Sequence, residues 1–339
     1  MPADAALKHR LAVSPSTAAV ALPRFETHIF ARGNAKLYNP DAIVVTRHFV
    51  FVDYQNDSDT APTSSIIVKY DRAGNVLGQV SVFGRSDGMR YDPYTHKIWA
   101  LVNNDGANGS PPRQPALFVI DPMTLAKTEY RFPATQQHGG GYDDLAFVNG
   151  KAFASASAPT LTAAGINNRQ AVVKLTLGAG TVSTTPIFFG NSIGLDVASG
   201  KVGHLNFADP DSLAVSGTSL VVVSEGDGQL AIVAHPGEAT QSISRLPSGS
   251  QLDEVAQTTG TSGTLFIADS TLDVVYAIRT IFPVGTFFVE APQGAPVQST
   301  IGTLDLTSGV LTPLLTQRDG IVNPGTLVFV PSGGEQEDY

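Results

Sequence analysis

The chain has 339 residues, of which 42% are hydrophobic and 15% are charged, a composition typical of a folded globular protein rather than a disordered one. Its formal net charge of -9, without any cluster of lysine and arginine, argues against nucleic acid and anionic membranes as partners. No apolar run reaches the about 18 residues that a transmembrane helix needs, and the absence of cysteine excludes disulfides, thiolate nucleophiles and cysteine-ligated zinc.

The first segment, residues 1–22, is expected to be an N-terminal extension. A single domain is expected over residues 23–335, followed by a tail at 336–339. The extension carries two basic residues but no apolar core of the length that a signal peptide needs, which is the character of a mature or trimmed N-terminus. A periplasmic or secreted location, with the export signal already removed, is therefore favoured.

From residue 41 onward, short segments rich in Val, Ile, Phe and Tyr alternate with turn signals such as RAGN, DPMT and SGT, which indicates antiparallel strands. The segments fall into a loose repeat of four strands. The second strands are expected at 48–55, 97–104, 151–158, 219–226 and 264–271. The third strands are expected at 65–71, 116–122, 171–177, 229–235 and 274–279. The fourth strands are expected at 76–84, 126–132, 181–189, 239–246 and 310–316.

The first strand of each repeat begins at a shared register that carries an aspartate in five repeats and a glycine in the sixth. These residues are Asp41, Asp87, Asp143, Asp211, Asp253 and Gly325. Four strands in roughly 40 to 50 residues are typical of a β-propeller blade, and inserted loops would explain the longer intervals. The sequence therefore predicts an all-β, six-bladed propeller with four-stranded antiparallel blades.

The sixth first strand, residues 325–332, is followed by no third or fourth strand. The segment 23–31 is therefore expected to supply the outer strand of that blade. Pairing the two ends of the chain in this way would close the ring and leave few exposed strand edges.

The blade pattern resembles six-bladed propellers of the SMP-30/gluconolactonase and NHL-repeat type, most clearly in SDGMRYDP at 86–93 and TLFIADSTLDVVYAI at 264–278. The resemblance implies a metal-dependent lactonase or related hydrolase, in which an axial cation polarises the ester carbonyl and activates water. It also implies metal ligands at strand starts of the Glu-Gly-Pro, Asn-Gly-hydrophobic and Asp-Gly-hydrophobic kind. Asp87-Gly88-Met89 matches the third kind, the first two have no counterpart, and Asn323-Pro324-Gly325 is a loose match to the second.

In a closed ring, equivalent strand starts converge on one axis, so the five aspartates are expected to meet at one mouth. Carboxylate oxygens suit a hard divalent cation, with calcium ahead of magnesium and manganese. For any single aspartate the alternative is a structural one, in which the carboxylate accepts hydrogen bonds from its own turn. Five unpartnered carboxylates would repel one another, which favours an ion or bridging waters for two or three of them together.

The long loops are expected on the same face as these aspartates, because they connect second to third strands or one blade to the next. His138 and His204 lie in two of the connections between blades and are candidate ligands or bases near the mouth. The glycines at 139–141 permit close approach of a ligand, although a flexible turn explains them equally well.

Two further carboxylates directly follow ring aspartates: Asp144 and Glu254. In an extended strand the next side chain points to the opposite face, so these two are expected to face a neighbouring blade. Their expected partners are Arg85, Arg90 and Arg169. A raised pKa in either carboxyl would make it a general-base candidate.

Together these features predict a metal-assisted hydrolase of lactone or ester type that acts on a small neutral molecule at the axial mouth. The alternative is a non-catalytic, NHL-like propeller whose long loops bind a protein partner and whose mouth carboxylates are structural or hold a structural ion.

Overall fold

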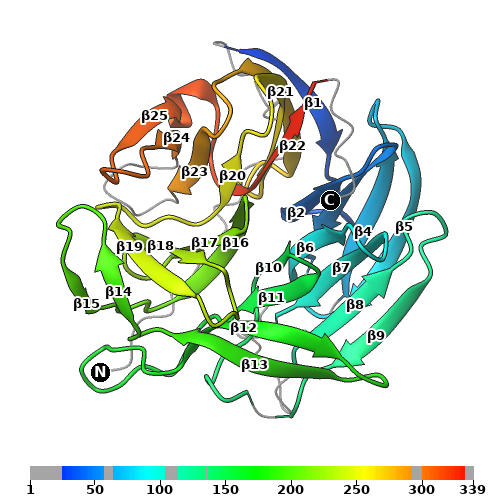
Figure 1. Cartoon of the computed structure of the whole chain (residues 1–339). Coiled ribbons are helices and arrows are strands. Elements are labelled where there is room, and N and C mark those ends of the chain that lie inside the picture. The colour runs from blue at the N-terminus through cyan, green and yellow to red at the C-terminus, as the bar shows by residue number, and fades with distance from the viewer. Residues whose placement is uncertain (1–24, 57–63, 104–113, 135, 292–299, 333–339) are drawn as a thin grey trace.

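The computed structural model describes residues 25–56, 64–103, 114–134, 136–291 and 300–332. In this part of the chain the only helical element is the 3-10 turn Gln317–Asp319, and the rest of the regular structure is β-strand. The strands form six sheets set as blades around a central axis (Figure 1). The six-bladed propeller predicted from the sequence is therefore confirmed. The expected extension and tail, 1–22 and 336–339, lie outside the described residues.

The first three blades follow the chain in order from inner to outer strand. Blade 1 consists of β2 (Pro40–Val45), β3 (Phe49–Tyr54), β4 (Ser64–Asp71) and β5 (Val76–Phe83). Blade 2 consists of β6 (Ser86–Asp92), β7 (Lys97–Val102), β8 (Ala116–Ile120) and β9 (Lys127–Arg131). Blade 3 consists of β10 (Leu145–Val148), β11 (Lys151–Ser155), β12 (Gln170–Leu177) and β13 (Val182–Phe189). All neighbouring strands in these blades are antiparallel, as predicted.

Blade 4 carries an additional hairpin. Its own strands are β16 (Pro210–Ser216), β17 (Ser219–Ser224), β18 (Gln229–Ala234) and β19 (Ser242–Pro247). The hairpin of β14 (Ile193–Asp196) and β15 (Val202–His204) extends this sheet to six strands, because β14 pairs in parallel with β19. The hairpin comes from the connection between blades 3 and 4 and accounts for the long interval between the ring positions of those blades.

Blades 5 and 6 are interleaved along the chain. Blade 5 consists of β20 (Val255–Gln257), β23 (Phe287–Ala291), β24 (Thr300–Leu304) and β25 (Leu311–Leu315). Blade 6 consists of β26 (Pro324–Pro331), β21 (Ser262–Asp269), β22 (Val274–Ile281) and β1 (Glu26–Arg32). The chain therefore leaves blade 5 after its inner strand, builds the two middle strands of blade 6, and returns to complete blade 5.

This interleaving corrects two expectations about the end of the chain. The segments 264–271 and 274–279 were predicted as the second and third strands of the fifth blade, but they are the middle strands of the sixth. The outer strand from 23–31 is in the sixth blade as predicted, but the chain ends do not pair directly. Strand β1 pairs with β22, and β26 pairs with β21, so the β21–β22 hairpin lies between them.

Six apolar clusters fill the spaces between adjacent blades, one at each junction of the ring. Phe51 and Ile98, for example, are fully buried between blades 1 and 2. Burying one such side chain contributes about 1.5–3 kcal/mol. Because every blade packs on two neighbours, the ring is a rigid frame that fixes the inner strand starts relative to one another.

No helix in the described part of the chain is long and apolar enough to cross a membrane.

Candidate functional site: an acidic cavity on the axis

In four of the six blades the ring position coincides with an irregularity of the inner strand. In blade 1 the ladder pairs Pro40 and then Ala42 with consecutive partners on β3, so Asp41 is left out as a bulged residue. The same shift occurs in blades 2, 4 and 6, where the residues left out include Asp87, Asp211 and Gly325 respectively. A bulge removes a residue from the pairing and redirects its side chain. The bulges at these positions therefore direct the side chains of this register toward the axis.

The inner strand starts enclose one axial cavity of about 180 Å³. Its wall consists of Asp41, Arg85, Asp87, Gly88, Asn103, Asp143, Asp144, Asp209, Asp211, Glu225, Asp253, Glu254 and Gly325. All five predicted ring aspartates and the glycine of the sixth repeat are therefore brought together. Nine carboxylates face one guanidinium in this wall, that of Arg85, which makes the cavity a strongly acidic environment.

Two side-chain amides tie three of the ring aspartates together. Gln55 Nε2 donates to Asp41 Oδ2 at 3.0 Å and to Asp87 Oδ1 at 2.7 Å. Asn103 Nδ2 donates to Asp87 Oδ2 at 2.8 Å and to Asp143 Oδ1. Each amide comes from the end of the second strand of its own blade. The two amides therefore bridge the carboxylates of blades 1, 2 and 3 in sequence around the ring.

Arg90 of blade 2 contacts three other blades. Its Nη2 donates to Asp144 Oδ2 at 2.5 Å in blade 3 and to the Leu213 carbonyl at 3.2 Å in blade 4, and lies 3.9 Å from Glu254 Oε2 in blade 5. Asp144 also accepts from the backbone N–H groups of Leu213 and Leu145. Of the three arginines expected as partners of Asp144 and Glu254, Arg90 fills that role for both.

Asp144 and Glu254 were expected to face a neighbouring blade and were candidate general bases. Both pair with Arg90 of blade 2, and both also line the axial cavity. Glu254 accepts a hydrogen bond from Ser212 Oγ at 3.0 Å. With Arg90 they form a charged cluster that joins blades 2, 3 and 5.

Burial is the main cause of the raised pKa values in this wall. It raises the pKa of Asp41 well above its usual range, and repulsion by Asp87 adds to the rise. Burial likewise raises the pKa of Asp211, with Asp253 and Asp143 as the next contributors. The pKa of Glu254 is raised by burial and by Asp144, against the opposing effect of Arg90. Groups of this kind favour a bound proton or a nearby cation over an isolated negative charge.

Neither candidate histidine lines the cavity. His138 is fully buried, its Nε2 lies 2.6 Å from the Gly141 carbonyl, and burial lowers its pKa to about 4. His204 is exposed on β15, at the edge of the blade 4 sheet farthest from its inner strand, with Nδ1 2.9 Å from the Asn191 carbonyl. The prediction that His204 reaches the mouth was wrong, because its loop forms a hairpin at the edge of the blade.

Several residues of the site were missed by sequence reasoning. Asp209 and Glu225 line the cavity, and Gln55 and Asn103 bridge its carboxylates. Glu290, on the second strand of blade 5, is fully buried close behind Asp253 and Glu254. Three of these five, Gln55, Asn103 and Glu225, directly follow a second strand, so a polar residue at that position was the available signal.

The donor atoms of the wall are of the kind that a divalent cation prefers. Carboxylate oxygens are the ligands that calcium prefers, and nine of them surround one small cavity. Asp211 accepts no hydrogen bond from any residue in the described part of the chain. In the same described residues no three His, Asp or Glu side chains are already arranged to hold a metal ion. The chemistry of the wall fits a hard cation, and ligation requires some of its side chains to move.

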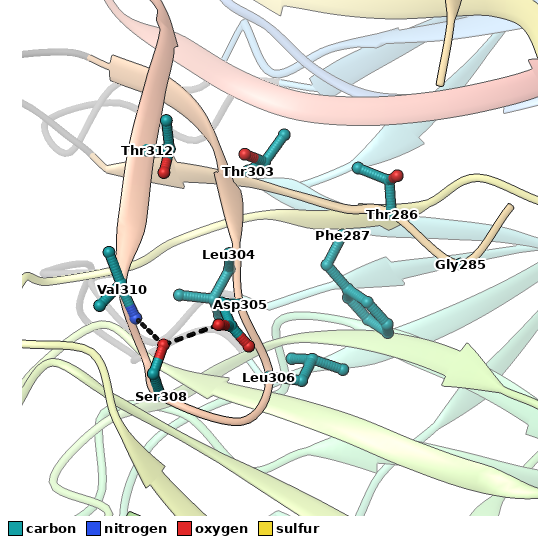
Figure 2. Close-up of a pocket in the computed structure, with 10 residues that line it drawn as sticks. All are labelled: Gly285, Thr286, Phe287, Thr303, Leu304, Asp305, Leu306, Ser308, Val310 and Thr312. Carbon is teal, nitrogen blue, oxygen red and sulfur yellow. Dashed lines mark hydrogen bonds between the residues drawn. The ribbon is translucent and has the colours of Figure 1, made fainter. Parts of the chain in front are cut away.

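A larger and more open hollow of about 560 Å³ lies on the hairpin of β24 and β25 (Figure 2). Its one carboxylate, Asp305, accepts hydrogen bonds from Thr307 and Ser308, which hold its pKa down to about 2. The other residues of the wall are Gly285, Thr286, Phe287, Thr303, Leu304, Leu306, Ser308, Val310 and Thr312. Because its single acid is already satisfied by its own turn, this hollow has no group poised for chemistry, in contrast to the axial cavity.

Comparison with known proteins supports the fold. No known family and no curated protein matches the sequence. A protein of unknown function from Desulfotomaculum acetoxidans matches with a TM-score of 0.50 and 12% identity, covering 86% of this chain and 75% of that one. The periplasmic gluconolactonase of Pseudomonas aeruginosa matches with a TM-score of 0.45 and 15% identity, covering 86% of this chain and 88% of that one. The PQQ-bound aldose sugar dehydrogenase of Streptomyces coelicolor matches with a TM-score of 0.49 and 10% identity, covering 95% of each chain. At 12% identity and a TM-score of 0.50, the similarity to the Desulfotomaculum acetoxidans protein concerns the fold alone, and the two matches with TM-scores under 0.5 carry no inference about this chain.

Proposed function

We propose that the axial cavity binds a divalent, oxygen-preferring cation, with calcium favoured, and that the loaded protein hydrolyses a small neutral lactone or ester at this mouth. The observation that supports the proposal most strongly is the excess of carboxylates over basic groups in the wall, nine against Arg85. Like charges at this density repel one another, and a bound cation relieves that repulsion.

The bound cation would polarise the substrate carbonyl and lower the pKa of a water molecule. The chain's own residues would hold the site together and accept the proton. Glu254 is the favoured general base, because burial and Asp144 raise its pKa and a base works best when its pKa approaches the working pH. Its contacts with Ser212 and Arg90 fix the orientation of its carboxylate.

The size and charge of the cavity restrict the substrate. A volume of about 180 Å³ corresponds to roughly six water molecules at about 30 Å³ each. Only the reacting group of a substrate therefore fits inside, with the remainder against the loops of the same face. Neutral substrates are favoured, because the acidic wall repels an anion.

The experiment measures hydrolysis of a panel of lactones and esters by chelator-treated protein, with and without added calcium, magnesium or manganese. The expected result is hydrolysis that requires the cation and is lost in Asp211→Asn. Glu129→Gln, which removes one exposed carboxylate of β9, is the matched control and should keep full activity. A wild-type protein that hydrolyses nothing in the panel with any of these cations would contradict the proposed reaction.

A second function, a non-catalytic binding scaffold, is favoured by one observation. Gln55 and Asn103 already hold Asp41, Asp87 and Asp143 together without an ion, which is what a purely structural ring requires. Under this alternative the melting temperature would not depend on divalent cations, and Asp211→Asn would leave the protein's binding behaviour unchanged.

A further inference from the structure

A hairpin on the rim of blade 4 carries its large side chains on one face. Strands β14 and β15 form the edge of that sheet farthest from its inner strand (Figure 1). Ile193 lies opposite His204, and Leu195 lies opposite Val202. Directly opposite residues of an antiparallel pair project from the same face, and so do residues two apart on one strand. All four side chains therefore share one face of the hairpin.

The other face of the hairpin carries glycine and is the one that packs on the protein. Gly194 pairs with Gly203 between the two pairs just described. Gly194 is buried, and a Cβ atom added there would lie 3.2 Å from the Ile243 carbonyl oxygen and 3.6 Å from the Leu205 side chain. The apolar face therefore points into solvent. This is the reverse of an ordinary surface hairpin, whose apolar side faces the core.

Four large apolar side chains gather on this hairpin and on the turn before it. Val202 is 70% exposed, Ile193 61% and Leu195 42%. Phe189, the last residue of β13, is 44% exposed, and its carbonyl accepts from the Ser192 N–H at 2.9 Å in the turn that leads into β14. These four side chains, here called the rim patch, present on the order of a few hundred Å² of apolar surface. An exposed patch of that size on a monomer is often an interaction site.

The charge around the rim patch favours a second copy of this chain as the partner. The chain has a formal net charge of -9, so two copies repel each other overall. Residues 189–204, in contrast, contain one acidic residue, Asp196, and one basic residue, Lys201. Asp196 is also paired with Arg245 at 2.8 Å. Two copies can therefore approach each other through this apolar, locally neutral surface with the least repulsion.

We propose that the rim patch packs face to face against the rim patch of a second copy of this chain, about a twofold axis. A twofold contact uses the same surface on both subunits, so an apolar patch is its own complement. The patch is smaller than the about 800 Å² that each partner buries in a stable interface, so the dimer is weak and depends on concentration. Because the hairpin lies at the outer edge of blade 4, the contact leaves both axial cavities accessible and is independent of the proposed function.

The test is the mass of the full-length protein by sedimentation equilibrium between about 5 and 500 µM, a range that brackets weak dissociation constants. We expect the wild-type mass to rise toward that of a dimer, and to rise further at high salt, which screens the net charge. Val202→Glu and Ile193→Glu should each weaken association about tenfold or more, because each places a charge in an apolar contact.

The matched control is Val310→Glu, which adds the same charge at a valine that is 58% exposed in the turn between β24 and β25. It should associate within about threefold of the wild type. The dilute variants should melt as the wild type does, because the replaced side chains are exposed in the monomer. A wild-type protein that stays monomeric over the whole range, or equal weakening by Val310→Glu, would overturn the proposal.

The geometry is tested by cross-linking, which is simple because the chain has no cysteine of its own. Val202→Cys, on the apolar face, should form disulfide-linked dimers on mild oxidation, detected on a non-reducing gel. Gly203→Cys should not, because its side chain would lie on the opposite face, where no atom is within 4 Å of an added Cβ. Dimers linked through Gly203→Cys but not through Val202→Cys would mean that the strand edges pair instead, and would overturn face-to-face packing.

Discussion

Replacing Arg90 by methionine tests how much its ion pair with Asp144 contributes to the stability of the propeller. Arg90 Nη2 lies 2.5 Å from Asp144 Oδ2, and the side chains are 22% and 3% exposed. Removing one partner of a buried ion pair costs about 3–5 kcal/mol, because the other charge stays buried. Asp144 keeps its hydrogen bonds from the Leu213 and Leu145 N–H groups. The expected loss in the free energy of unfolding is therefore about 3 kcal/mol, the lower end of that range.

The assay is urea unfolding at pH 7, with the double variant Arg90→Met, Asp144→Asn completing a mutant cycle. The double variant should recover much of the lost stability, since no unpaired charge remains. The loss in Arg90→Met should also shrink as the pH falls, because Asp144, whose pKa is raised by burial, then takes up a proton instead of staying charged and unpaired. A loss under about 1 kcal/mol at pH 7, or a double variant that is less stable than the single one, would refute the reasoning.

Three further predictions concern the cavity and the interleaved blades. Without cations, the wild type should become more stable in calorimetry as the pH falls from 7 toward about 4, the pKa of an unfolded carboxyl group. Carboxyls such as that of Asp211 have a raised pKa in the folded state, so over this window the folded protein binds protons that the unfolded chain does not. A steady loss of stability over this window would contradict the prediction. Gly141→Ala would push a methyl group into Asn103. We expect about 1–3 kcal/mol of destabilisation in urea unfolding, together with weaker cation binding. Unchanged stability would mean that Asn103 is free to move. Ala268→Cys with Thr326→Cys should form a disulfide that is detectable by gel mobility, because the two residues are direct partners on β21 and β26; no cross-link would argue against the interleaved sixth blade.

The ring of aspartates was predictable because its signal is local and repeated. An aspartate recurs at the start of five of the six inner strands, and the radial fold brings these five positions together at the axis. The physical device behind it, the bulge at Asp41 and its equivalents, was not predictable, since a bulge depends on pairing with a second strand that sequence periodicity does not register.

The interleaving of blades 5 and 6 was missed for a different reason. The strands β21 and β22 have the composition and spacing of ordinary second and third strands, and nothing local distinguishes the blade in which they pair. Only the long interval between Asp253 and Gly325 indicated an irregularity. The choice of partner is made by packing, with Leu265 and Ile267 buried in the junction of blades 5 and 6.

Single residues in loops were the least predictable part of the site. His204 was placed at the mouth because its connection is long, but the connection folds into a hairpin at the edge of blade 4. Glu290 was overlooked because its strand, β23, was not recognised as part of blade 5. In both cases the error lay in the path of the chain rather than in the chemistry of the side chain.

The most direct test of the central claim, that the axial cavity takes up a divalent cation, is a calcium titration of chelator-treated protein by calorimetry at pH 7 in two buffers of different ionisation enthalpy. We predict one bound ion per chain and a release of protons, because carboxyls of the wall whose pKa burial raises, such as those of Asp41 and Asp211, must lose protons to bind it. The absence of binding, or binding without proton release, would contradict the account.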